Sequence, residues 1–379
     1  MMEKIRAFLS REAVLVVAAL AAVTSCVLVP FDEGYASYVD WRTLALLFCL
    51  MAVVTGLRFM GVMRLLGNWA VSRASSVRAL AFALVALTFV SSMAVTNDVA
   101  LITFVPLALV VLAEAGESRF AASVVVLMTV SANLGSMLLP VGNPQNLFLY
   151  RVSGMDFFQF VSIMVPVVVV SAAMLVAAVL IVFRGNAGGL SNRTSRKALS
   201  KPTGRQGLMF VSYLILFVLS VMAVVGIIDA FAVAALVAFA LLLLDRRSLA
   251  KVDYGLLLTF VALFVFVGNM ARVPAVHEAL SALVGIAPFC AAVGSSQVIS
   301  NVPAAVLLSG FTNNWTALIV GTNLGGLGTP IASMASLISL KIATASGLVG
   351  KRHYLTVFTA WNVAFLAVLS AANAVFGWA

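Results

Sequence analysis

Long apolar runs alternate with short polar or charged connections along the whole chain. Many of these runs approach 20 residues, the length at which a helix crosses a hydrocarbon core about 30 Å thick. The predicted full spans cover residues 12–31, 42–62, 157–183, 207–228, 230–244, 254–271 and 354–376. The pattern therefore predicts an all-α membrane protein.

Polar residues interrupt further apolar runs, twice in each half of the chain. Residues 79–92 and 98–113 flank the polar segment 91–98, which predicts a re-entrant hairpin with its tip at membrane depth. A helix that starts near 119 is interrupted at 139–146, where Pro and Gly remove donors and helical preference. The second half has a hairpin tip near 295–303 and a helix from about 315 that breaks near 328–335. Such backbone is tolerated in a membrane only where it is buried in protein or lines a wet cavity.

These interrupted elements belong to an internal duplication. Residues 133–147 match residues 323–337 without a gap, at an offset of 190 (323 − 133). Two further matched pairs precede them in the same order: 91–97 with 295–301, and 39–41 with 252–254. Ordered matches of this kind indicate two structural repeats.

Charge placement orients the repeats. Basic residues concentrate in the loop 184–206, which the positive-inside rule places in the cytoplasm together with the amino terminus. Counting crossings, residues 39–41 open a helix from outside and residues 252–254 open its counterpart from inside. We therefore predict inverted repeats over 1–183 and 207–379, the second including a linking span at 207–228. The prediction is about nine full crossings plus two hairpins. The first apolar run is long enough to span and is expected to be retained.

Composition narrows the class of protein. The chain is 63% hydrophobic and 9% charged, so it belongs in lipid rather than in a soluble domain. The net charge of +10 lies in topological loops, which argues against nucleic acid as a partner. Three widely spaced cysteines in or beside apolar runs exclude a disulfide framework and a zinc cluster, and we expect no cofactor.

Neutral hydrogen-bonding side chains gather at the hairpin tips and helix breaks. The candidate substrate-binding residues are Thr96, Asn97, Asn143, Asn146, Ser300, Asn301, Thr329, Ser333 and Ser336, with Gln145 beside them. An unpaired polar group in hydrocarbon costs several kcal/mol, so symmetric clusters predict one shared aqueous site. The structural alternative is that they cap the broken ends and bond helix to helix.

Asp98 is the one carboxylate expected deep in the membrane, and its repeat counterpart is the uncharged Val302. A charge there costs about 3 kcal/mol or more unless it is paired, hydrated or protonated. Asp98 is therefore the candidate for coupling to a cation, as a Na⁺ ligand or a proton carrier. The alternative is a structural N-cap of the following helix. The candidate coupling groups are Asp98, Asn97, Gly142, Asn301 and Gly328, with Na⁺ expected at Asn97, Asp98 and Asn301.

Three stretches resemble the ion transporter superfamily of arsenite permeases, Na⁺/H⁺ antiporters and citrate and divalent-anion symporters. Residues 96–106, TNDVALITFVP, are similar to the first hairpin of arsenite permeases, and residues 142–147, GNPQNL, resemble a divalent-anion element. Thr96-Asn97 and Ser300-Asn301 look like the paired hairpin tips of the divalent-anion symporters. Those symporters have Thr at the positions where this chain has Asp98 and Val302. Uncharacterised bacterial anion permeases look most similar. The resemblance implies elevator-type movement of the site past a scaffold, often in a homodimer.

These observations predict a secondary active transporter in the cytoplasmic membrane. It is expected to move a small anion, coupled to Na⁺ or H⁺, by alternating access between membrane faces. Na⁺/H⁺ antiport through Asp98 and arsenite efflux are the alternatives, and a channel would suit two inverted hairpins less well. An enzyme is not expected, because Asp98 has no deep acidic partner and no His-Glu-x-x-His motif occurs.

Overall fold

The computed structural model describes residues 12–185 and 204–379, and this part of the chain contains helices and connecting turns without a strand. Among the described residues, eight helices are long and apolar enough to cross a membrane, or nine if one bent helix pair is counted as a span. The prediction of an all-α, multi-pass membrane protein is confirmed. The predicted basic loop falls mainly on residues 186–203, outside the described residues.

In the first half, the helices follow one another with short connections. They are α2 (Ala13–Leu28), α3 (Tyr35–Tyr38), α4 (Trp41–Phe59), α5 (Val62–Ser72), α6 (Val77–Ala94), α7 (Asn97–Glu114), α8 (Ala121–Gly135), α9 (Pro144–Ser153) and α10 (Phe157–Val182). Two short 3₁₀ turns, η1 (Ser118–Phe120) and η2 (Pro140–Gly142), precede α8 and α9.

The second half runs through a similar order of long and short helices. They are α11 (Gly204–Val225), α12 (Ala230–Leu244), α13 (Arg246–Ala250), α14 (Tyr254–Ala271), α15 (Pro274–Ile286), α16 (Pro288–Ile299), α17 (Asn301–Ser309), α18 (Trp315–Gly325), α19 (Met334–Ala345) and α20 (Lys351–Phe376).

Aspartate caps begin two helices that the sequence matched. The Asp40 carboxylate accepts the Thr43 N–H at 3.0 Å at the start of α4. The Asp253 carboxylate accepts the Leu256 N–H, also at 3.0 Å, at the start of α14. Such a cap satisfies one of the amide groups left free at a helix start. The matched triplets at 39–41 and 252–254 therefore perform the same local task.

The helical pattern differs from the prediction in several respects. The arms of the first hairpin, α6 and α7, are 18 residues each, longer than their apolar runs suggested, and each passes the length test for a span. The additional helix α5 follows α4 where only a connection was expected, and the additional helix α15 lies between α14 and the second hairpin. The pair α15 and α16 is bent by 112°. Helices α16 and α17 have only 12 and 9 residues, so the second hairpin is the shorter one.

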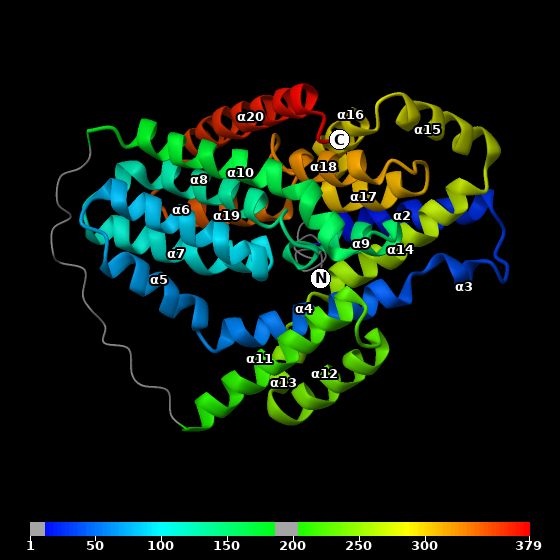
Figure 1. Cartoon of the computed structure of the whole chain (residues 1–379), viewed down its shortest axis with the longest axis horizontal. Coiled ribbons are helices and arrows are strands. Elements are labelled where there is room, and N and C mark those ends of the chain that lie inside the picture. The colour runs from blue at the N-terminus through cyan, green and yellow to red at the C-terminus, as the bar shows by residue number, and fades with distance from the viewer. Residues whose placement is uncertain (1–11, 186–203) are drawn as a thin grey trace, which may run out of the picture.

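The helices pack in groups that mix the two halves (Figure 1). Helix α2 lies along α14, and α4 lies against α11 and α12. A second group contains α6, α7, α8 and α10 from the first half with α19 and α20 from the second. Helices α16, α17 and α18 form a third group, and α17 also contacts α9. The interrupted helices of each half therefore pack against elements of the other half.

An ion pair joins the two halves near the ends of α2 and α14. Arg272 donates to both carboxylate oxygens of Asp32, at 3.0 and 2.6 Å, and also to the Tyr38 hydroxyl at 2.9 Å. These hydrogen bonds hold the pKa of Asp32 below its ordinary value. The pair is exposed, so it orients the 29–38 loop more than it stabilises the fold.

Candidate functional site

Both predicted broken helices are interrupted over the same number of residues. Helix α8 ends at Gly135 and α9 begins at Pro144, while α18 ends at Gly325 and α19 begins at Met334. The ends and starts therefore differ by the same 190 residues as the sequence match. Each break leaves free carbonyl groups at one new end and free N–H groups at the other.

Asn133 in the last turn of α8 connects the first break to the second half. Its Oδ1 accepts hydrogen bonds from Asn97 Nδ2 at 3.1 Å and from Ser333 Oγ at 3.0 Å. Its Nδ2 donates to the Gly326 carbonyl and to Ser336 Oγ, each at 3.4 Å. One buried amide thus contacts a hairpin tip and the start of α19 at once.

Asn323, the repeat counterpart of Asn133, makes the reverse connection. Its Nδ2 donates to Asn146 Oδ1 at 2.6 Å and to the Ile319 carbonyl at 2.8 Å. Its Oδ1 accepts from Asn143 Nδ2 at 3.3 Å. The second broken helix therefore holds the start of α9.

The two sets of bonds correspond residue by residue. At the offset of 190, Asn133 corresponds to Asn323, Asn143 to Ser333, and Asn146 to Ser336. Each central Asn therefore binds the N-cap of the opposite broken helix and the residue three positions later. We call the connected set the polar network: Asn97, Asn133, Ser136, Asn143, Asn146, Asn323, Ser333 and Ser336.

Four helix N-termini meet at or beside the polar network. Asn97 begins α7, Asn143 caps α9 and Ser333 precedes α19, and all three are bonded within it. Asn301 begins α17, and its N–H donates to the Ala332 carbonyl at 2.9 Å, next to Ser333. Each helix N-terminus carries about half a positive charge, and the network has no Lys, Arg or His side chain. The positive potential therefore comes from backbone dipoles, which suits a small anion.

Asp98 lies in the first turn of α7, directly after Asn97. It is half-buried, and its backbone N–H donates to Asn97 Oδ1 at 3.0 Å. Within the described residues, no side chain donates a hydrogen bond to its carboxylate. The structure therefore does not use this carboxylate as the N-cap of α7, and Thr96 occupies the cap position. The Asp98 oxygens remain available to a cation or a proton.

The second tip is bonded to its own broken helix more extensively. Ser300 has φ +74° and ψ 153°, a conformation unfavourable for residues other than Gly, and its Oγ donates to the Ala332 carbonyl at 3.3 Å. Gln297, one turn earlier in α16, donates to the carbonyls of Gly325 and Leu327 at 2.8 and 2.9 Å. The second hairpin is therefore fixed to the break between α18 and α19.

One glycine in each broken helix allows the neighbouring hairpin to approach that helix closely. A Cβ atom on Gly135 would lie 2.1 Å from the Phe89 carbonyl oxygen and 2.5 Å from Ser92 Oγ. A Cβ atom on Gly325 would lie 2.6 Å from Ser296 Oγ. Ser92 and Ser296 are themselves repeat counterparts, so the close contact recurs in both halves.

The candidate residues fall into three places. Asn97, Asn143, Asn146, Ser333 and Ser336 join the polar network, and Ser300 and Asn301 contact it through Ala332. Thr96 lies at the first tip and its side chain makes no cap hydrogen bond to α7, while Thr329 is exposed and bonded to Gln297. Gly142 ends the η2 turn, and Gly328 lies within the second break with φ +100°.

The central residues Asn133 and Asn323 were missing from the predicted set. Each begins its copy of the repeated stretch, and identity between the two copies was the signal that could have revealed them. Gln297 was also missed, because its counterpart Met93 is apolar and symmetry gave no reason to select it.

A small cavity of about 40 Å³ reaches the second tip. It is lined by Ser300 and Val302 at the start of α17, Met334 of α19, and Glu12 and Asp253 near the starts of α2 and α14. That volume suits water or a bare cation, whereas drug-sized ligands need several hundred Å³. An anion as large as citrate therefore requires a more open conformation.

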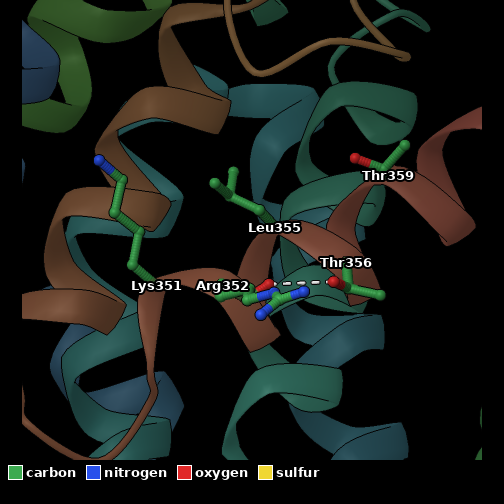
Figure 2. A pocket seen from close by; sticks show the side chains of 5 residues that line it. All are labelled: Lys351, Arg352, Leu355, Thr356 and Thr359. Atoms are coloured by element: carbon green, nitrogen blue, oxygen red, sulfur yellow. Dashed lines mark hydrogen bonds between the residues drawn. The ribbon is translucent and has the colours of Figure 1, made fainter.

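A larger hollow of about 540 Å³ lies on the surface of α20 (Figure 2). It is lined by residues of that helix alone: Lys351, Arg352, Leu355, Thr356 and Thr359. Thr356 donates to the Arg352 carbonyl within the helix at 3.1 Å. None of these residues belongs to the polar network, and their open, one-sided arrangement does not enclose a ligand. In the described part of the chain, no group of three or more His, Cys, Asp or Glu residues could hold a metal ion.

Comparisons with known proteins find a transporter family and relatives named as transporters or as an inner membrane protein. A family model described as citrate transporter matches residues 1–314. The inner membrane protein YbiR of Escherichia coli is 31% identical over 331 residues, covering 83% of each chain. The uncharacterized transporter MJ0456 of Methanocaldococcus jannaschii is 30% identical over 314 residues, covering 83% of this chain and 84% of that protein. The silicon efflux transporter LSI3 of rice, Oryza sativa, is 33% identical over 135 residues, 36% of this chain and 27% of LSI3.

Proposed function

The chain belongs to the citrate transporter family, and we propose that it is a secondary active transporter that moves a small anion coupled to Na⁺ or H⁺. The anion class is a dicarboxylate, a citrate-like molecule or an inorganic oxyanion. The amino terminus lies in the cytoplasm, as the charge distribution favours.

The observation that carries this proposal is the meeting of four helix N-termini around the neutral polar network. An anion gains from the N-terminal dipoles of α7, α9, α17 and α19. The amide and hydroxyl groups around Asn133 and Asn323 supply donors that can turn toward it. Because the site has no lysine or arginine to hold the anion permanently, release needs only loss of the coupling cation.

Inverted repeats and alternating access complete the proposed mechanism. The reciprocal bonds of Asn133 and Asn323 support two related halves that share one site. The hairpins and broken helices move together past the scaffold formed by α2, α4, α11, α12 and α14, in the manner of an elevator. A homodimer would hold that scaffold still.

Asp98 links the anion to the driving ion. Its carboxylate follows Asn97, which bonds directly to Asn133 in the network. An ionised Asp98 opposes an anion in the neighbouring site, whereas binding of Na⁺ or a proton removes that repulsion. Cation and anion binding therefore favour each other, which is the requirement for symport.

Na⁺/H⁺ antiport, or efflux of a species such as arsenite, is the second candidate. It is favoured by the absence of cationic side chains from the polar network and by the Asp98 carboxylate, which has no donor among the described side chains. An antiporter would use Asp98 for Na⁺ and H⁺ in turn and need no anion.

Uptake into proteoliposomes distinguishes these functions. Citrate, succinate, sulfate, arsenite and silicate are offered in turn, with an inward Na⁺ gradient, an inward H⁺ gradient or neither. The proposal predicts that one anion accumulates above its outside concentration with only one of the gradients. If no anion moves while Na⁺ and H⁺ exchange, Na⁺/H⁺ antiport replaces anion symport as the function.

A further inference from the structure

Helix α5 has three faces of different character. Met63, Gly67 and Ala70 are buried and lie one turn apart along the helix. This face packs on the first hairpin, closely enough that a Cβ atom on Gly67 would lie 2.5 Å from Leu107 Cδ2 of α7. The other two faces of α5 are turned away from the rest of the protein, so they are open to an outside partner.

The first of these open faces is apolar. Leu65, Leu66 and Trp69 lie three to four residues apart, on one side of the helix, and are 43%, 41% and 56% exposed. Neighbouring exposed side chains of this size need an apolar environment, which acyl chains of a membrane supply. Tryptophan is also common where a membrane meets water. This face therefore suits the apolar side of a membrane surface.

The second open face is polar, and the charges at it are positive. Arg64 and Ser72 are both exposed on this side of α5. Arg73, directly after the helix, has its guanidinium carbon 4.6 Å from the centre of the Trp69 ring. The sequence 58–78 contains four arginines and no acidic residue. Within the described residues, neither Arg64 nor Arg73 forms an ion pair, so both charges remain for an outside partner.

The contact with Trp69 leaves the hydrogen-bond donors of Arg73 available. A cation–π contact engages the face of the ring and provides no oxygen acceptor for the guanidinium N–H groups. Those groups match the geometry of phosphate oxygens, to which arginine donates two hydrogen bonds at once. The Arg73 and Trp69 pair therefore joins a phosphate-binding group to an apolar ring, as the headgroup and the acyl chains of a phospholipid require.

The corresponding helix of the second half lacks this charge. Helix α15 follows α14 as α5 follows α4, and α5 and α15 lie at opposite ends of the molecule (Figure 1). Leu283 and Ile286 of α15 are 63% and 85% exposed, so this helix also has an open apolar side. It contains no lysine or arginine and has one acidic residue, Glu278. The positive charge thus belongs to the α5 end alone, which the positive-inside rule assigns to the cytoplasm.

We propose that α5 binds the headgroups of anionic phospholipids in the cytoplasmic leaflet. Arg64 and Arg73 contact the phosphates, while the Trp69 ring and the neighbouring leucines lie among the acyl chains. Helix α5 joins α4 of the scaffold to the hairpin helices α6 and α7, on which it packs. A bound anionic lipid therefore anchors the connection between the scaffold and the first hairpin.

Quenching of Trp69 fluorescence by brominated lipids tests this binding. In the full chain, every other tryptophan is replaced so that Trp69 alone emits: Trp41→Phe, Trp315→Phe, Trp361→Phe and Trp378→Phe. Phosphatidylcholine vesicles contain a fixed minor fraction of lipid with brominated acyl chains, either phosphatidylglycerol or phosphatidylcholine. Each arginine at an anionic surface strengthens the attraction about fivefold. We therefore expect Trp69 to prefer the anionic lipid at least fivefold, and Arg64→Gln/Arg73→Gln to lower that preference at least fivefold.

Lys351→Gln/Arg352→Gln is the matched control. It removes the same amount of charge from two exposed residues at the start of α20, and it should leave the lipid preference at Trp69 unchanged. The ratio between the two lipids is compared within each variant, so a change in the emission of Trp69 itself cancels. If the chain with a single tryptophan does not fold, the difference in quenching between the native chain and Trp69→Phe isolates the same emission.

Three results would overturn the proposal. One is equal quenching by the two lipids, and another is a preference for the anionic lipid that survives Arg64→Gln/Arg73→Gln. The third is weak quenching by both lipids, which would show that protein, such as a second copy of the chain, covers α5. The measurement needs no transported anion, so its outcome is independent of the proposed function.

Discussion

The two hairpin tips have matching sequences and different bonding. Asn97 at the first tip makes a single side-chain bond to its broken helix, at Asn133, and is followed by the carboxylate of Asp98. At the second tip, Ser300, Asn301 and Gln297 all bond to the residues of the neighbouring break. The two tips therefore share a sequence pattern but differ in helix length and in polar contacts. In the proposed mechanism, the second tip is a fixed wall of the site, and the first tip responds to the ion.

The largest expected effect comes from removing the central Asn of each broken helix. Asn133→Ala and Asn323→Ala each leave buried partners in the opposite half without a hydrogen bond, at about 1–3 kcal/mol for each unsatisfied group. We expect kcat/KM for anion uptake to fall about 100-fold in either variant, which corresponds to about 2.7 kcal/mol. Initial uptake rates in proteoliposomes measure this.

Thr322→Val is the matched control for these variants. Thr322 is buried beside Asn323, but its hydroxyl bonds only to carbonyls of its own helix. It should retain uptake within about threefold, because no bond between the halves is lost. Equal losses of uptake in Thr322→Val and Asn323→Ala would show that uptake does not depend on the hydrogen bonds between the two halves.

A smaller effect is expected on stability, from filling the close contact between each hairpin and its broken helix. Ala at position 135 meets the backbone oxygen of Phe89, which cannot turn away, whereas Ala at position 325 first meets the side chain of Ser296. We expect Gly135→Ala to lower the free energy of unfolding by about 3 kcal/mol and Gly325→Ala by about 1 kcal/mol. Thermal unfolding in one detergent gives the order, and a reversed order would contradict the comparison.

The smallest expected effect concerns backbone strain at the tips. Ser300 has φ +74°, while its counterpart Thr96 has φ −60° and ψ 148°, an ordinary extended conformation. Ser300→Gly should relieve strain of about 1 kcal/mol or more, and Thr96→Gly should cost about 0.5–1 kcal/mol in chain entropy. The melting temperature of Ser300→Gly should therefore exceed that of Thr96→Gly. Equal shifts would mean that the second tip stores no strain.

The sequence predicted the helical class, the breaks and the polar tips because these depend on local chemistry. Apolar runs, Pro140, Gly142 and Pro144 determine where helices can continue, and the duplication drew attention to both breaks at once. The helices α5 and α15 were missed because short amphipathic segments resemble ordinary polar connections. The bonds of Asn133, Asn323 and Gln297 join segments about 30 to 200 residues apart, and no local pattern specifies such partners.

The candidate residues of the second break do not all lie together. Thr329 is exposed and bonds to Gln297 rather than to the polar network that contains Ser333. Comparison of the repeats gave no reason to select Gln297, whose counterpart is Met93. Positions that differ between the repeats therefore account for the different bonding of the two tips.

The most direct test of the account is driven accumulation of the transported anion by wild type and Asp98→Asn, in proteoliposomes with an imposed Na⁺ or H⁺ gradient. Asp156→Asn serves as the control, because Asp156 is an exposed helix cap and Asn caps a helix equally well. The account predicts that wild type and Asp156→Asn concentrate the anion, while Asp98→Asn exchanges it without concentrating it. Gradient-driven accumulation by Asp98→Asn at the wild-type level would contradict coupling at the first tip.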